Sequence, residues 1–244
     1  MINRRKFLQN SLKGIGALAV VGAGGTIMNS ALGNPLQVFG AKATGERLLK
    51  MKQSPHYKDG KFWNISPTPD LTEGYGYWDI LKMYNQKILL KAPAAPLPIF
   101  KPDYNKQVTS PDITWLGHSS YVLRLPDFTI IVDPVFHKAS PFQWVGPGPY
   151  SGPDSFGLNS LPAEIDLLLI SHDHYDHLDY LTIKQLHPRV KQIVTSLGVG
   201  AHLELWGVPA SKITELDWWE TTNLKTDLTI TATPARHFSG RGLN

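Results

Sequence analysis

The chain has 244 residues, of which 42% are hydrophobic, and this suits one large globular domain or a domain with an extension. Its formal charge of +4 comes from residues 1–34, because that segment has four basic and no acidic side chains and leaves 20 of each sign elsewhere. This balance gives no electrostatic case for binding nucleic acid. The absence of cysteine excludes disulfides and thiolate ligands, so any metal must be held by histidine and carboxylate.

Residues 1–34 have the features of a targeting segment. The basic start Asn3-Arg-Arg-Lys-Phe-Leu8 precedes an apolar, glycine-rich stretch at 15–27, which is shorter than the about 20 residues that a membrane span needs. Arg4 and Arg5 resemble the pair of a twin-arginine export signal, with an ordinary secretory signal or an uncleaved anchor as alternatives. We therefore expect the export machinery as a partner, and a periplasmic or membrane-associated protein.

Residues 35–110 are predicted to form a proline-rich N-terminal arm. Its segment Lys91-Ala-Pro-Ala-Ala-Pro-Leu-Pro98 favours polyproline II and cannot enter the interior of a sheet. The arm is expected to wrap the surface without a catalytic part. Four aromatic residues could pack it onto the main body: Trp63, Tyr75, Tyr77 and Trp78.

The main domain is predicted over 111–244 and opens with short apolar segments typical of strands. These segments are 113–116, 120–125 and 128–132, with a tight turn at Pro126-Asp127. His118 lies between the first two segments, and Asp133 ends the third. His137 lies in a long connection rich in glycine and proline, where we expect it to be exposed or to face a substrate.

The most informative stretch follows the apolar run Ile165–Ile170, which is typical of a buried strand. It reads Ser-His-Asp-His-Tyr-Asp-His-Leu-Asp over 171–179, and a helix with Asp179 as N-cap is predicted at 180–186. His172 and His174 would project to the same side of an extended segment. Three imidazoles and a carboxylate this close together suit a borderline divalent metal such as zinc, whereas a merely solvated histidine-rich loop is the alternative.

The rest of the chain is predicted to alternate short strands with one helix. The strands are 192–195, 212–216 and 228–232, and the helix is 199–206. His202 on that helix is expected at the surface. His237 follows directly after the last strand.

The pattern H-x-H-x-D-H resembles the signature of the metallo-β-lactamase superfamily. Together with Trp115-Leu-Gly-His118, Asp133-Pro-Val-Phe136 and Pro234-Ala-Arg-His237, it resembles the branch of N-acyl-phosphatidylethanolamine-hydrolysing phospholipase D. The resemblance covers residues 56–244. It implies an α/β fold, the αββα metallo-β-lactamase sandwich, with a dinuclear site that usually holds zinc.

The resemblance also implies a role for each site residue. His172, His174 and His237 would hold a first Zn²⁺, and a second would be held by Asp176 and His177. Asp176 would in addition act catalytically, by orienting a metal-activated hydroxide. Two further residues would support the site: Asp133 by a hydrogen bond to a ligand imidazole, and His118 by lining the site or packing beneath it.

The implied function is hydrolysis of a phosphodiester, in a small molecule or a lipid, by the metal-activated hydroxide. Two alternatives stay open. One is a lactonase or another ester or amide hydrolase of the same fold, and the other is a non-catalytic metal-binding remnant.

The remnant is considered because the sequence departs from the family after His237. Family members carry a bridging aspartate and a final histidine further along, whereas the last seven residues contain neither an acid nor a histidine. We therefore expect a sandwich that is incomplete at the C-terminus. Its second metal position would have only Asp176 and His177, so the chain would bind at most about one metal tightly, where an intact parent binds two.

Overall fold

The computed structural model describes residues 35–69, 71–76, 78–79, 82, 92–143 and 146–241. The predicted signal at 1–34 lies outside them, as do Tyr77 and Lys91. The chain divides between Gln37 and Val38, and residues from Val38 onward form one compact unit. Among the described helices, none combines the length and apolarity needed to cross a membrane.

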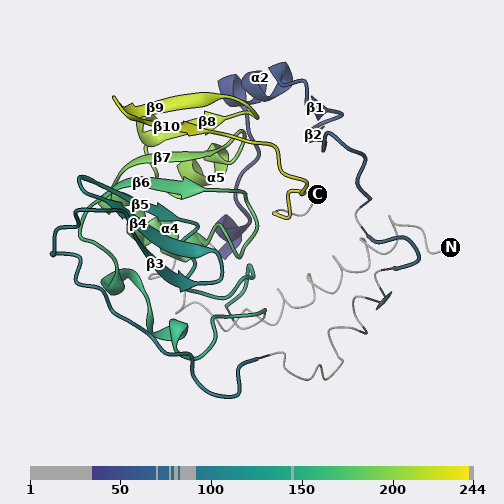
Figure 1. The fold of residues 1–244 in the computed structure, drawn as a ribbon. Coiled ribbons are helices and arrows are strands. Elements are labelled where there is room, and N and C mark those ends of the chain that lie inside the picture. The colour runs from purple at the N-terminus through teal and green to yellow at the C-terminus, as the bar shows by residue number, and fades with distance from the viewer. Residues whose placement is uncertain are drawn as a thin grey trace. The chain divides into compact units, whose positions relative to one another are not determined.

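A mixed six-stranded sheet with the order β3-β4-β5-β6-β7-β8 lies at the centre of this unit (Figure 1). Its strands are β3 (Asp112–Gly117), β4 (Ser120–Leu125), β5 (Phe128–Val132), β6 (Ile165–Ile170), β7 (Val190–Ser196) and β8 (Ile213–Leu216). The first two pairings are antiparallel and the other three are parallel. The carboxyl ends of β3, β5 and β6 therefore meet at one edge of the sheet.

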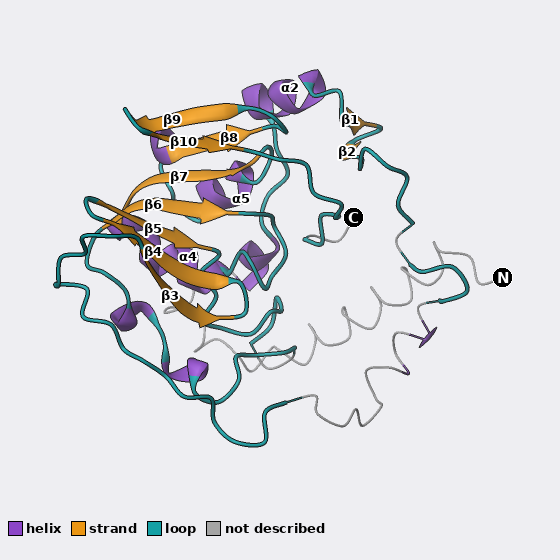
Figure 2. Cartoon of the chain, in the orientation of Figure 1, coloured by secondary structure: helices purple, strands orange, loops and turns teal. Residues whose placement is uncertain are grey.

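Helices α4 (Tyr180–Leu186) and α5 (Gly200–Leu205) lie against this sheet (Figure 2). Ile183 of α4 and Leu203 of α5 are fully buried in one cluster with Leu168 of β6 and Ile193 of β7. The helices thus cover one apolar face of the sheet.

The hairpin of β9 (Thr221–Lys225) and β10 (Leu228–Thr231) contributes to a second, separate apolar cluster. Leu224 and Ile230 of the hairpin pack there against Leu167 of β6 and Val194 of β7. Successive side chains of a strand point to opposite faces, so Leu167 and Leu168 place the two clusters on opposite sides of the sheet. The described residues therefore form a helix layer, a sheet and a hairpin layer, which confirms the predicted α/β class.

The elements that flank the sheet were only partly predicted. The structure adds α2 (Gly45–Gln53), β1 (Tyr57–Lys58), β2 (Lys61–Phe62) and β9 to the predicted set. Short 3-10 turns lie at Pro35–Phe39, Pro153–Ser155, Leu158–Ser160, His187–Arg189 and Ala210–Lys212.

The predicted aromatic packing of the N-terminal arm is wrong for the three residues that are described. Trp63, Tyr75 and Trp78 are 48%, 60% and 68% exposed. Ion pairs hold the arm instead, since Arg47 of α2 lies 2.6 Å from carboxylate oxygens of both Glu204 and Glu215. These pairs are mostly shielded from water at the Arg47 side chain, which is 16% exposed, so they are less screened than surface pairs.

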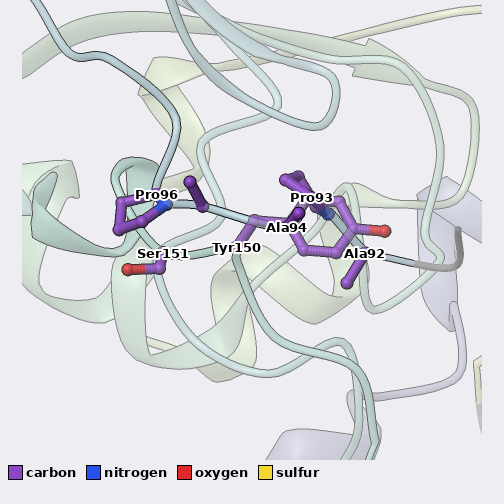
Figure 3. Close-up of a pocket in the computed structure, with 7 residues that line it drawn as sticks. Ala92, Pro93, Ala94, Pro96, Tyr150 and Ser151 are labelled. Atoms are coloured by element: carbon purple, nitrogen blue, oxygen red, sulfur yellow. The ribbon is translucent and has the colours of Figure 1, made fainter.

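The proline-rich segment runs along the loop at 150–152 without joining a sheet, as its composition predicts (Figure 3). The Leu97 amide donates to the Ser151 carbonyl at 2.9 Å. The pocket between Ala92–Pro96 and Tyr150 is lined by alanine, proline, tyrosine and serine. It contains neither imidazole nor carboxylate, so it does not suit a metal ion.

Candidate metal centre

The loop at 171–179 lies where β6 ends and α4 begins, and local hydrogen bonds keep it compact. The amides of His177 and Leu178 both donate to the His174 carbonyl, at 3.0 and 2.8 Å. The Asp179 carboxylate accepts from the Leu181 amide at 3.1 Å, which confirms the predicted N-cap. The tight turn brings the motif's three histidines to the same edge of the sheet.

His237 joins two of these histidines to form the first ligand group. The segment after β10 returns to the sheet edge (Figure 1), where His237 Nε2 lies 3.1 Å from His172 Nε2 and 3.2 Å from His174 Nδ1. Zinc–nitrogen bonds of about 2.0–2.1 Å in a tetrahedral arrangement place ligand atoms about 3.3 Å apart. The three nitrogens therefore converge at a spacing that suits one cation.

The protonation of this group also suits a cation. Burial, and then the neighbouring imidazoles of His177, His174 and His237, lower the pKa of His172 to about 4. Burial and His237 also lower the pKa of His174. Both rings are therefore neutral near pH 7, and a neutral ring nitrogen is the form that binds a metal.

A second ligand group lies beside the first and consists of His118, Asp176 and His177. Asp176 Oδ2 lies 3.0 Å from His118 Nε2 and 3.7 Å from His177 Nε2. The ring centroids of His172 and His177 are 4.0 Å apart, so the two groups are adjacent. Burial alone would raise the pKa of Asp176, but its backbone hydrogen bond and the charges of His177 and His118 outweigh burial and lower it. Asp176 therefore offers an ionised oxygen ligand.

Asp133 supports this arrangement from the end of β5. It adopts a left-handed backbone conformation with φ of 40°, and its Oδ1 accepts from the Ser171 amide at 2.8 Å. Its Oδ2 lies 2.9 Å from His177 Nδ1. Burial would lower the pKa of His177, but Asp133 outweighs burial and raises it. Because Nδ1 is engaged by Asp133, the lone pair of His177 is directed to Nε2, as in carboxylate–histidine–metal arrangements.

The structure thus brings all five predicted ligands together, with Asp133 and His118 beside them. The donors are imidazole nitrogens and a carboxylate, which fit a borderline divalent cation in each group. Metal binding by these residues stays a prediction.

Sequence reasoning missed the residues that hold the His237 loop in place. Ser239 Oγ donates to Asp173 Oδ2, and Arg241 Nε donates to the Asp173 carbonyl at 2.8 Å. Arg241 is 5% exposed, donates further to the carbonyls of Val38 and Leu178, and burial lowers its pKa to about 10. The available signal was an acid between two motif histidines with an arginine shortly after His237.

The arm also reaches this loop, although we expected no part for it at the site. The His237 amide donates to Asn64 Oδ1 at 3.1 Å, and Arg236 Nε donates to Thr68 Oγ1 at 2.9 Å. The arm therefore helps to position a candidate ligand.

Two other histidines lie elsewhere than expected. His202 is not at the surface, because its side chain is 13% exposed and its Nδ1 accepts from the Ala41 amide at 3.0 Å. His137 lies 2.6 Å from Asp179 Oδ2 through its Nδ1, with 32% of the side chain exposed. It therefore supports the start of α4, because a partly buried polar ring is held by the nearest carboxylate.

Comparison with protein families agrees with this fold and site. Residues 129–244 match the family described as Beta-lactamase superfamily domain, and this part of the chain belongs to that superfamily. The central mixed sheet with its helix layer is consistent with the metallo-β-lactamase fold.

Several relatives are named in ways that bear on function. The chain is 37% identical over 230 residues to an uncharacterised protein of Mycobacterium tuberculosis, covering 91% of this chain and 60% of the relative. It is 37% identical over 142 residues to N-acyl-phosphatidylethanolamine-hydrolyzing phospholipase D 1 of Caenorhabditis elegans, covering 54% and 39%. It is 31% identical over 86 residues to a metal-dependent hydrolase of Sulfolobus acidocaldarius, covering 35% and 33%. The chain spans less than two thirds of the length of each of these relatives.

Proposed function

We propose that this domain serves a divalent-metal-dependent hydrolase, with zinc as the metal and a phosphodiester as the substrate. The observation that carries the proposal is the pair of adjacent ligand groups built on the loop at 171–179. A relative named as a metal-dependent hydrolase supports the reaction class. The donor set of histidine and carboxylate, without cysteine, suits zinc.

When bound, two adjacent divalent cations supply Lewis acidity toward a substrate oxygen and activation of a water molecule. The chain's own residues prepare the site for them. Asp133 holds the His177 ring in place, and burial keeps His172 neutral. Asp176 is ionised and its side chain is 40% exposed, so it can accept a hydrogen bond from water and orient it.

The phosphodiester is proposed from the similarity to the phospholipase D of Caenorhabditis elegans and from the motifs shared with its branch. The substrate class would be a small molecule or a lipid with a phosphodiester bond. A lactonase or esterase of the same fold would use the same metal chemistry, so substrate preference has to be measured.

The test is turnover of the zinc-loaded 244-residue chain on bis(p-nitrophenyl) phosphate and on a panel of lactones and p-nitrophenyl esters. We expect the phosphodiester to be preferred, and chelation or His174→Ala to remove the activity. A preference for lactones would contradict the phosphodiester assignment. Bound zinc without turnover on any substrate would contradict the hydrolase and favour a non-catalytic metal-binding protein.

We also propose that residues 1–34 direct export by the twin-arginine route, to the periplasm or its membrane. This route carries folded proteins, which fits a domain whose metal binding and folding are coupled. Replacing Arg4 and Arg5 with lysine keeps the charge but removes the planar guanidinium pair. We expect the variant to remain in the cytoplasm on cell fractionation, and normal export would favour the general secretory route.

A further inference from the structure

His118 lies in the turn between β3 and β4, and the structure fixes this turn at both ends. Before the turn, Trp115 Nε1 donates to the His118 carbonyl at 2.9 Å. After it, Ser120 Oγ donates to the Asp133 carbonyl at 2.6 Å and accepts from the Val135 amide at 3.1 Å. The turn is therefore tied to the same strand end that carries Asp133.

The backbone of His118 is in the left-handed region, with φ of 43°. A residue with a side chain rarely adopts this conformation unless the surroundings impose it, and such residues gather at functional sites. Asp133, at φ of 40°, is in the same situation. Both residues lie where strands of the central sheet end, beside the second ligand group.

The side chain of His118 supplies what the second group otherwise lacks. The sequence offers this group only Asp176 and His177, and two protein ligands hold a divalent cation weakly. The ligand atoms of all three residues lie within 4.8 Å of one another, so one cation could contact each of them. His118 Nε2 also lies at the outer, exposed side of the group, since its side chain is 59% exposed against 16% for His177.

We propose that His118 is a third protein ligand of a second divalent cation, which it holds together with Asp176 and His177. The inference rests on the proposed function for the presence of metal, but it concerns binding rather than turnover. It changes the expected stoichiometry, because counting two ligands gave about one tightly bound metal per chain. With three ligands in each group, we expect about two.

The competing role for His118 is a hydrogen bond that merely positions Asp176. Two substitutions separate these roles. His118→Ala removes both the ligand and the hydrogen bond, whereas His118→Gln keeps a side-chain donor but replaces the imidazole ligand with a poor one. His137→Gln is the matched control, because His137 is also paired with an aspartate but lies outside both ligand groups.

The experiment is metal binding by the 244-residue chain, measured by calorimetric titration with zinc and by elemental analysis after desalting. We expect about two equivalents for the unmodified chain and His137→Gln, and about one for His118→Ala and His118→Gln. Substitution with Co²⁺ gives a second readout. Proton NMR should show one fewer exchangeable, paramagnetically shifted imidazole N–H signal in both His118 variants.

Two outcomes would overturn the proposal. If His118→Gln binds two equivalents with unchanged affinity and keeps every shifted signal, His118 only positions Asp176. If the unmodified chain binds one equivalent, the second cation is absent. Neither measurement uses a substrate, so a chain that binds two cations and hydrolyses nothing would refute the proposed function and leave this ligand assignment standing.

Discussion

Gly240 sets how closely the last described loop approaches the first ligand group. A Cβ at this position would lie 2.4 Å from His174 Cδ2 and 2.5 Å from its Nε2. The loop cannot easily retreat, because Ser239 and Arg241 on either side are both bonded to Asp173. The absence of a side chain at 240 is therefore required for the present position of the His174 ring.

We predict that Gly240→Ala weakens zinc binding at the first group by about tenfold or more, or about 1.4 kcal/mol, because the His174 ring must move. Calorimetric titration measures this change. Gly157→Ala is the control, since a Cβ there meets no atom within 4 Å and φ of −169° suits any residue. Equal affinities for the two variants would show that the His237 loop yields freely.

At the scale of single residues, sequence identified what lies within one short motif. His172, His174 and His177 were predictable because the chain itself keeps them within six residues of one another. The bonds of Asp173 to Ser239 and Arg241 were not, because they join positions 66 and 68 residues apart. Such contacts depend on the tertiary fold rather than on local spacing.

Helix α4 begins at a carboxylate that serves several partners. Asp179 is 5% exposed and lies 2.5 Å from Thr182 Oγ1, 2.6 Å from His137 Nδ1 and 3.1 Å from the Leu181 amide. Removing it would leave buried donors without an acceptor.

We predict that Asp179→Ala lowers the free energy of unfolding by about 2–3 kcal/mol, which combines loss of a helix cap with unpaired buried donors. Denaturant titration measures this loss. Asp227→Ala is the control, because that side chain is 81% exposed and its change should stay within about 0.5 kcal/mol. Similar losses for both variants would mean that the cap contributes little.

At the scale of elements, apolar periodicity gave β4, β5, β6 and α4 with their observed bounds. It missed β9, because Thr-Thr-Asn-Leu-Lys has a single apolar residue and only the facing sheet supplies the rest of its environment. It also missed α2, whose nine residues include no buried one. Elements whose stability comes from partners elsewhere carry a weak local signal.

At the scale of the whole molecule, residues far apart in the chain meet around His202. The Ala41 amide donates to its Nδ1, and Asp173 Oδ2 lies 3.9 Å from its Nε2. Burial, and then the charges of Arg241 and Arg47, lower the pKa of His202 to about 4, although Asp173 opposes this. The imidazole is therefore neutral in the folded chain near pH 7.

We predict that this junction makes the metal-free protein sensitive to acid. The unfolded chain protonates this histidine near pH 6.5 and the folded one near 4, so the unfolded state binds more protons between these values. Stability should fall as the pH decreases from 6.5 to 4. His202→Gln should reduce the slope of Tm against pH without abolishing it, because the pKa of His172 is also lowered to about 4. An unchanged slope would contradict this account.

The separation of the ligands along the chain gives bound metal a further consequence. His118 and Asp176 are 58 residues apart, and His174 and His237 are 63 apart. A cation that joins such positions acts as a reversible crosslink, and closing a loop of this length costs the unfolded chain about 4 kcal/mol in the chain-entropy treatment of disulfides. This chain has no cysteine with which to make a covalent crosslink. Metal captured before export would therefore staple the fold independently of the redox state of the compartment that receives it.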